Sequence, residues 1–168
     1  MSNECARKVY IVDGSRTPQL KSRGKVGPFS PGDLAVAAAR PLLLRNNFPL
    51  DALDEVILGC MMPGEREANV GRVVALRLGI PQSVPAWTVQ RNCASGMQSI
   101  DSAYKNIRNG DSDLVLAGGV ESMSWAPVLF NHTMVNWLGQ MMRSRSIGQK
   151  LSTIFKLRGK HFKPVIAL

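Results

Sequence analysis

The sequence has no long apolar run and no recognisable targeting segment. Across its 168 residues, no apolar stretch approaches the ~20 residues that a transmembrane helix needs. The first eight residues contain an acid, and they resemble neither the apolar core of a secretory signal nor an acid-poor transit peptide. We therefore expect a cytoplasmic protein without a membrane span. An apolar fraction of 45% with 20% charged residues indicates a globular chain rather than a disordered one.

Cysteine is also scarce. The three cysteines, Cys5, Cys60 and Cys93, are odd in number and widely spaced. Since they form no CxxC pair, we predict neither a structural metal site nor a disulfide framework. In a reducing compartment each is a free thiol, so the question is which of them is placed to react.

Acidic residues are missing from the last part of the chain. Residues 1–121 hold 14 basic and 12 acidic residues, whereas residues 122–168 hold seven basic residues and no acid, out of a net charge of +9. Such a stretch is either a solvated or mobile face or a surface that attracts a polyanion, such as nucleic acid, lipid or a phosphate-rich cofactor. The stretch Arg143–Lys163 contains only Phe155 and Phe162 as aromatics. This weakens binding of single strands, and we expect no nucleic-acid partner.

The first half of the chain alternates between strand-like and helix-like segments. Lys8–Asp13 is β-branched and alternating, which predicts a first strand. Asp33 is the expected N-cap of a helix over Leu34–Arg45, which Pro41 should kink or interrupt. A buried strand is expected at Asp54–Cys60 and a second helix at Asn69–Leu78.

The clearest unit follows. Ala86–Gln90 predicts a strand, Ala94–Asn109 a helix and Leu114–Ala117 another strand, which together form a right-handed βαβ unit. The helix carries an apolar stripe at helical spacing, formed by Met97, Ile100, Ala103, Tyr104 and Ile107.

The pattern then loosens, with weak helical periodicity over Val135–Met142 and Ile147–Phe155. We predict an α/β fold with an organised domain over residues 1–121 and a second region over residues 122–168.

Cys93 lies where a predicted strand gives way to a helix. Active sites collect at the carboxyl ends of parallel strands. The unpaired N–H groups and the positive dipole end of the helix favour a thiolate over a thiol. The same N–H groups are placed to hold an oxyanion. On spacing alone, a small residue packed at a turn is an equally reasonable interpretation of Cys93. Cys60, at the end of a buried strand, is expected to be structural, and Cys5 an incidental thiol.

Four segments resemble the thiolase family in order and separation. Asn92–Gln98 (NCASGMQ), with its lead-in Thr88-Val89, resembles the thiolase nucleophile motif. Gly118–Ser124 (GGVESMS) resembles the segment after the next strand of that family. Ser15–Pro18 (SRTP) and Asn69–Arg72 (NVGR) are similar to two further thiolase segments. Together they extend over most of residues 8–125.

The resemblance implies a nucleophile, a reaction and a fold. Cys93 would take an acyl group from an acyl-CoA, forming or cleaving 3-ketoacyl-CoA through an acyl-cysteine intermediate. Coenzyme A thioesters would be the substrates and no further cofactor would be needed. The fold would be the first half of a thiolase: a mixed sheet built from βαβ units, helices on both faces, and the start of a basic loop region. The family also implies a homodimer or homotetramer at full length. Gln90 departs from the family, which more commonly has a small polar residue there.

The histidines do not complete this site. Thiolases use histidines and a second cysteine from their C-terminal half, whereas His132 and His161 lack the Gly-His-Pro context of the activating histidine. We interpret His161 as part of a solvated basic segment and His132 as a loop residue. The chain is therefore expected to be a fragment, inactive alone, whose basic residues would suit CoA phosphates. The alternative is a non-catalytic, self-associating module whose basic tail binds nucleic acid or anionic lipid.

Overall fold

The computed structural model describes residues 7–21 and 25–166. Contacts divide the chain into two compact units, the first reaching Trp125 and the second beginning at Ala126. Each unit is described by itself. The domain boundary expected at residue 121 stays a prediction, and Cys5 lies outside the described residues.

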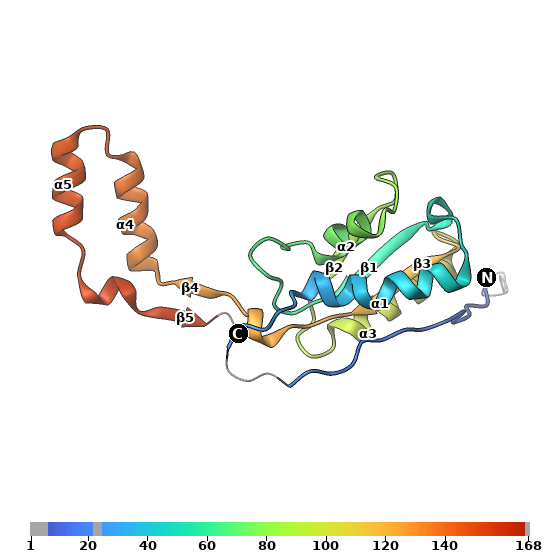
Figure 1. Cartoon of the computed structure of the whole chain (residues 1–168). Coiled ribbons are helices and arrows are strands. Elements are labelled where there is room, and N and C mark those ends of the chain that lie inside the picture. The colour runs from blue at the N-terminus through green and yellow to red at the C-terminus, as the bar shows by residue number, and fades with distance from the viewer. Residues whose placement is uncertain (1–6, 22–24, 167–168) are drawn as a thin grey trace, which may run out of the picture. The chain divides into compact units, whose positions relative to one another are not determined.

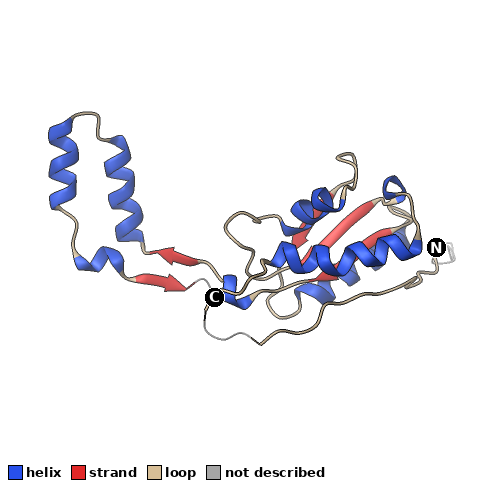
Figure 2. Ribbon diagram, in the orientation of Figure 1, coloured by secondary structure: helices blue, strands red, loops and turns tan. Residues whose placement is uncertain are grey.

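The first unit is built around a parallel sheet of three strands (Figure 2). β1 (Glu55–Gly59) lies in the centre, flanked by β2 (Ala86–Val89) and β3 (Val115–Gly119). Val56 of β1 is in register with Ala86 on one side and with Leu116 on the other. Among the described residues of this sheet, every pairing is parallel. Strands linked through helices in this way confirm the expected α/β class. The mixed sheet expected from the resemblance is not seen in this unit, since the three described strands are all parallel.

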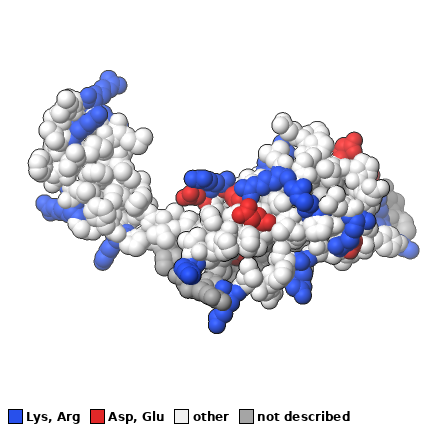
Figure 3. Space-filling view, viewed as in Figure 1, with Lys and Arg blue, Asp and Glu red and all other residues white. Residues whose placement is uncertain are grey.

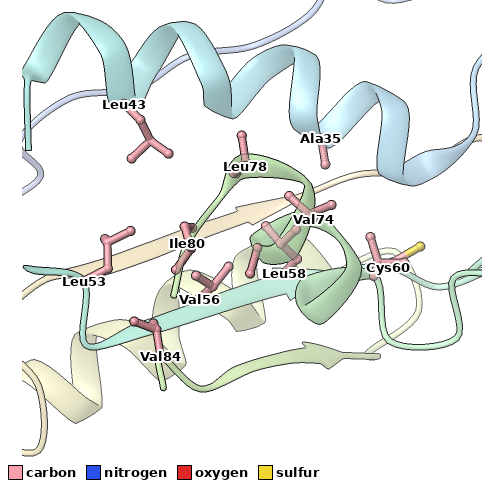
Figure 4. Packing of buried hydrophobic residues seen from close by; sticks show 12 residues of the cluster. Ala35, Leu43, Leu53, Val56, Leu58, Cys60, Val74, Leu78, Ile80 and Val84 are labelled. Atoms are coloured by element: carbon pink, nitrogen blue, oxygen red, sulfur yellow. The ribbon is translucent and has the colours of Figure 1, made fainter. Parts of the chain in front are cut away.

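Helices cover both faces of the sheet (Figure 1). α1 (Pro31–Asn46) packs on α2 (Val70–Leu78), which contacts β1 and β2, while α3 (Ser95–Asn109) packs on β1 and β3. Side chains alternate between the two faces of a strand. Val56 and Leu58 of β1 therefore join the core beneath α1 and α2 (Figure 4), and the fully buried Ile57 points to the opposite face. A short 3-10 helix, Leu50–Ala52, precedes β1.

The start of α1 differs from the prediction. Ser30, rather than Asp33, is the N-cap: its hydroxyl accepts the backbone N–H of Asp33, and the Asp33 carboxylate accepts the N–H of Ser30. This reciprocal capping box satisfies two N–H groups, and Pro31 is accommodated because the first helical residue needs no N–H donor. The predicted interruption at Pro41 does not occur, since α1 continues to Asn46.

The strand predicted at Lys8–Asp13 is absent, and this prediction was wrong. The segment is unpaired and Ile11 is 89% exposed. It is held at its ends instead, by an ion pair between Arg7 and Asp113 and by Arg45, whose Nε lies 2.6 Å from Oδ2 of Asp13. In the described part of the chain the outer edge of β3 carries no paired strand, and an apolar groove separates the segment from that edge.

An apolar groove of about 670 Å³ lies between this segment and β3. Its walls include the N-terminal residues 9–14, the strand residues 115–117 and the predicted apolar stripe of α3. Met97 and Ile100 of that stripe are exposed, while Ala103 is buried. The stripe exists as predicted, but part of it lines the groove instead of a closed core.

The second unit combines a strand pair with two helices. β4 (Val128–Phe130) and β5 (Pro164–Ile166) pair antiparallel, and α4 (His132–Arg143) and α5 (Ile147–Phe155) lie between them in sequence. Further 3-10 turns occupy Met123–Trp125 and Gly159–Phe162. In the part of the chain that the structure describes, no helix is long and apolar enough to cross a membrane.

Candidate active site

Cys93 is exposed in the short loop between β2 and α3. The preceding Asn92 has a φ of 47°, in the left-handed region that only a few residue types other than glycine adopt readily. Asparagine tolerates this region because its short side chain can hydrogen-bond locally. The backbone therefore reverses sharply at Asn92, immediately before the thiol.

The hydroxyl of Ser95 holds this loop together. Ser95 Oγ accepts the N–H of Arg91 at 2.8 Å and donates to the carbonyl oxygen of Asn92 at 2.7 Å. Since Ser95 is 5% exposed, both bonds are shielded from water. Ser95 thus fixes the backbone on both sides of Asn92 and, through it, the position of Cys93.

The N-terminus of α3 has no side-chain cap. Each of α1, α2, α4 and α5 begins with a Ser or Asn whose side chain accepts a backbone N–H of the first turn. At α3 the N-cap position holds Ala94, and no side chain accepts there in the described residues. The first N–H groups of a helix have no acceptor within the helix, so α3 presents donors and a positive dipole end next to Cys93.

Glycines let α3 rest directly on the ends of two strands. A Cβ added at Gly59 would overlap the backbone carbonyl of Ser95, and one at Gly119 would lie 2.7 Å from Cα of Gly96. Oγ of the fully buried Ser99 lies 2.7 Å from the carbonyl oxygens of both Gly96 and Gly118. Backbone-to-backbone contact leaves the first turn of α3 little freedom to shift, and Cys93 is attached to that turn.

The loops after all three strands are joined through Met61. Glu121, which follows β3, accepts the N–H of Met61 at 2.8 Å and that of Met62 at 3.2 Å. Gln90, which follows β2, donates from Nε2 to the carbonyl oxygen of Met61 at 2.8 Å. Gln90, the residue that departs from the thiolase pattern, therefore ties the loop before Cys93 to the loop after β1.

Cys60 is the opposite of Cys93 in its surroundings. It is 1% exposed at the end of β1, as the sequence led us to expect. Burial, followed by the negative charge of Glu121, raises the pKa of its thiol to about 12. Cys60 therefore remains a neutral thiol near pH 7 and is a poor nucleophile.

Two other thiolase-like segments have identifiable structural roles. Asn69 caps α2 by accepting the N–H of Arg72 at 3.1 Å, and its Oδ1 also accepts the hydroxyl of Thr88 at 2.9 Å. Gly71 donates its N–H to that hydroxyl at 2.9 Å, and a side chain at Gly71 would overlap the carbonyl of Trp87. The NVGR segment thus holds α2 against β2, the strand that leads to Cys93.

The SRTP and GGVESMS segments meet at a second hollow. Thr17 and Pro18 share a cavity of about 520 Å³ with residues 121–124. Residues far apart in sequence are therefore brought together at the carboxyl end of β3, on the same edge of the sheet as the loop that carries Cys93.

The histidines differ from their predicted surroundings. His161 is buried rather than solvated, because its Nδ1 accepts the N–H of Arg158 at 3.0 Å and closes the 3-10 turn. His132 is the first residue of α4 rather than part of a loop. Both belong to the second unit, so the unit that carries Cys93 contains no histidine. Over residues 7–21 and 25–166, no group of three His, Cys, Asp or Glu side chains could hold a metal ion.

A family model described as "Thiolase, N-terminal domain" matches residues 9–153. The match covers well over half of the chain. The chain belongs to the thiolase family. Its three parallel strands and flanking helices are those of the N-terminal half of the thiolase fold, which confirms the resemblance and the fold predicted from the sequence.

Similar thiolases and solved structures agree with this assignment. The beta-ketoadipyl-CoA thiolase of Pseudomonas knackmussii is 41% identical over 146 residues, covering 85% of this chain and 36% of the relative. The crystal structure of the Bacillus anthracis acetyl-CoA acetyltransferase matches with a TM-score of 0.59 and 40% identity, covering 63% of this chain and 27% of that one. The Acat5 thiolase from Ascaris suum, solved in complex with coenzyme A, matches with a TM-score of 0.59 and 29% identity, covering 62% and 27%.

The chain spans about a third of the length of the curated relatives it matches. The residues that position Cys93 were not predicted from the sequence. Ser95 and Glu121 lie inside the thiolase-like motifs, but no structural role was predicted for either. Gly59 and Met61 lie outside these motifs. The hydroxyl of Ser95 bonds to residues three and four positions away, but the contacts of Glu121, Gly59 and Met61 join residues tens of positions apart, for which one sequence carries no signal.

Proposed function

We propose that this chain carries the acyl-accepting half of a thiolase site, with Cys93 as the nucleophile. The Cys93 thiolate would attack the carbonyl carbon of an acyl-CoA and form a tetrahedral oxyanion. When the oxyanion collapses, coenzyme A leaves as a thiolate and the acyl group remains on Cys93 as a thioester. Free coenzyme A or the α-carbon of a second acyl-CoA would then receive it, in thiolysis or condensation respectively.

The observation that supports this proposal best is the exposed thiol beside the uncapped end of α3. The N–H of Ser95 bonds to the carbonyl oxygen of Asn92 at 3.2 Å, but those of Gly96 and Met97 have no side-chain cap, so these two would be available to the negative oxygen of the tetrahedral intermediate. The contacts of α3 with Gly59 and Gly119 fix these donors before substrate binds, and preorganised donors are the ones that contribute most to catalysis.

The proposed site requires a base that the first unit does not contain. The thiol proton of Cys93 must be removed before or during attack, and residues 1–125 hold no histidine. In thiolases the activating histidine and the second cysteine come from the C-terminal half. We therefore propose that the 168-residue chain alone turns over little, and that the whole protein is the acyltransferase and forms a homodimer or homotetramer.

Some of the cations of the basic second unit are the proposed counterpart of CoA phosphates. Its seven lysines and arginines have no acidic neighbours in the sequence of that unit, and the similar Ascaris thiolase was solved with coenzyme A. The domain division at residue 121 and the cytoplasmic location are likewise proposals from the sequence.

Mass spectrometry of the whole protein after exposure to acetyl-CoA tests the nucleophile. We expect one acetyl adduct that maps to Cys93, is removed by hydroxylamine, and is lost in Cys93→Ser. Cys60→Ser is the matched control and should keep the adduct. If the whole protein under turnover conditions never carries an acyl group on Cys93, the proposal is wrong.

A further inference from the structure

The two helices of the second unit expose apolar stripes. Residues three, four or seven positions apart share a helix face. The exposed stripe residues are Val135, Leu138 and Met142 of α4 and Ile147, Leu151, Ile154 and Phe155 of α5. Met142, Ile147 and Phe155 are 87%, 79% and 85% exposed. Amphipathic helices normally bury such a stripe against a core, so each of these faces lacks a partner in the described residues.

The second unit does not need these stripes for its own packing. Met134 is 5% exposed on the buried side of α4, and Trp137 donates from Nε1 to the carbonyl oxygen of Thr153 at 2.7 Å. Asn131 donates from Nδ2 to the carbonyl oxygens of Lys160 and Lys163, at 3.0 Å and 2.8 Å. The helices are thus held together by other residues, and the stripes are available to an external partner.

The same unit is strongly and uniformly basic. From Ala126 onward the chain contains no acid, and its cations are Arg143, Arg145, Lys150, Lys156, Arg158, Lys160 and Lys163. In Figure 3 the surface formed by α4 and α5 shows lysine and arginine side chains and no acidic ones. Arg143 and Lys156 also line a hollow of about 460 Å³ between α4 and α5, together with polar side chains.

We propose that the α4–α5 hairpin docks on an anionic lipid surface. The apolar stripes would enter the boundary between headgroups and acyl chains, and the cations would lie against lipid phosphates. This is the arrangement by which amphipathic basic helices bind a membrane interface. The two helices have 12 and nine residues, so each is far shorter than the ~20 residues needed to cross a bilayer.

Charge complementarity decides between this partner and the others. A second copy of the hairpin would bring seven positive charges against seven more, and like charges at an interface are unfavourable. Nucleic acid would match the cations, but Phe155 is the single aromatic among the exposed stripe residues named above, which leaves little surface on which bases could stack. An anionic membrane surface accounts for both the apolar stripes and the charge.

Co-sedimentation of the full 168-residue chain with vesicles tests the proposal. We expect binding to phosphatidylcholine vesicles that contain about a third phosphatidylglycerol, and little binding to phosphatidylcholine alone. Raising the salt should weaken the binding, because the cations are screened. In a Trp87→Phe/Trp125→Phe background, which leaves Trp137 as the one tryptophan of the sequence, vesicles with brominated acyl chains should also quench the fluorescence of Trp137 in α4 and so show contact with the acyl region.

Exposed positions allow variants that leave the fold intact. Ile147→Ser with Phe155→Ser should weaken binding about tenfold or more, because the chain loses two apolar side chains that would be buried in the lipid. Leu44→Ser is the matched control, since Leu44 is exposed on α1 of the other unit and should bind as the unmodified chain does. Lys150→Gln with Lys156→Gln should weaken binding about tenfold or more at low salt. Arg66→Gln, exposed in the first unit, is the control for charge.

Any of the following results would overturn the proposal. The first is equal binding to neutral and anionic vesicles. The second is unchanged binding in the Ile147/Phe155 variant together with complete release by excess coenzyme A, which would assign the cations to a free phosphate ligand. The third is that short DNA binds more tightly than anionic vesicles, or that the stripe variants abolish a dimer of the chain in solution instead of lipid binding.

Discussion

At the residue scale, the two cysteines that the structure describes differ in what controls thiol reactivity. Cys93 is exposed beside the N-terminus of a helix, whereas Cys60 is buried next to a carboxylate. Cys60 donates to Oε1 of Glu121 at 3.7 Å, and ionisation would place two negative charges together in a buried site. One thiol is thus available to substrate and the other is part of the core.

Alkylation with iodoacetamide should separate the two thiols. In a Cys5→Ser background at pH 8, we expect Cys93 to be modified and Cys60 to stay unmodified. Because the pKa of Cys60 is raised to about 12, its thiolate fraction increases only as the pH rises toward that value. Native Cys60 should therefore remain slow to react from pH 7 to pH 10, as peptide mapping by mass spectrometry would show.

Denaturant supplies the control for this experiment. In the unfolded chain Cys60 loses its burial and its carboxylate neighbour, so both thiols should be alkylated at similar rates. Fast modification of Cys60 in the folded chain at pH 8 would contradict the structure.

Gly59 is a second residue on which the geometry of the site depends, because it has no side chain. A methyl group there would overlap the carbonyl of Ser95, so Gly59→Ala must displace the first turn of α3. We expect a loss of about 2–3 kcal/mol in the free energy of unfolding, as is typical of an overpacked core. Alkylation of Cys93 should change in rate as well, because its loop moves with α3. Urea denaturation and alkylation kinetics measure the two effects.

Gly64→Ala is the matched substitution, since a Cβ at Gly64 would meet no atom within 4 Å. It should leave the stability and the Cys93 alkylation rate close to those of the unmodified chain. If Gly59→Ala behaves like Gly64→Ala, the close contact between β1 and α3 is wrong.

At the element scale, a buried carboxylate joins α1 to the segment before α2. Glu67 accepts the hydroxyl of Ser30 and the N–H of Gly32, both at 2.8 Å, and pairs with Arg77 at 2.9 Å. Its side chain is 4% exposed. One side chain thus satisfies donors at the N-terminus of α1 and a guanidinium of α2, and it fixes the packing of the two helices over the sheet.

Glu67→Ala should therefore destabilise the first unit by about 2–4 kcal/mol, because buried donors lose their acceptor and Arg77 loses its buried partner. Urea denaturation followed by circular dichroism would measure this loss. Glu65→Ala is the control: Glu65 is exposed and lies 3.6 Å from Arg66 in a solvated pair, so its loss should cost less than ~0.5 kcal/mol. Equal effects of the two substitutions would rule out this role for Glu67.

The order of elements was predictable from local patterns, while their edges and partners were not. The period of apolar residues and the turn signals at Gly79 and Gly110 were sufficient for β1, α2, β2, α3 and β3. No strand forms at Lys8–Asp13 because β-propensity describes only a side chain suited to a sheet. Pairing also needs backbone contact, and a groove separates this segment from the edge of β3. Asp33 was mistaken for the cap because Ser30 lies before two helix-breaking residues, Pro31 and Gly32, which the N-cap position accommodates.

The position of Cys93 in the candidate site was predictable from the sequence, but the contacts around it were not. The junction of a strand and a helix at Cys93 follows from residues next to it in sequence. The contacts that position it connect Gly59 with Ser95 and Met61 with Gln90 and Glu121. These pairs come together only when the three strands align, so no local pattern predicts them.

At the scale of the whole molecule, the two units present different surfaces. The first unit has nearly balanced charge, and its apolar groove borders β3, whereas the second is basic with apolar helical stripes. The proposed acyl chemistry belongs to the first unit and the proposed lipid contact to the second. The two proposals can therefore fail separately, since Cys93→Ser should not alter vesicle binding and the Ile147/Phe155 variant should still be alkylated at Cys93.

The open edge of β3 has a consequence for how the chain behaves in storage and on heating. An unpaired edge lined by apolar side chains is a template for strands of other molecules. We expect the 168-residue chain to form light-scattering particles at a rate that rises steeply with protein concentration. Val115→Lys, which places a charge on that edge, should slow this growth. If turbidity is independent of concentration or unchanged by Val115→Lys, another surface is responsible. If growth does proceed through this edge, the lifetime of the folded chain is set by how often two molecules meet there, and the melting temperature alone is a poor guide to that lifetime.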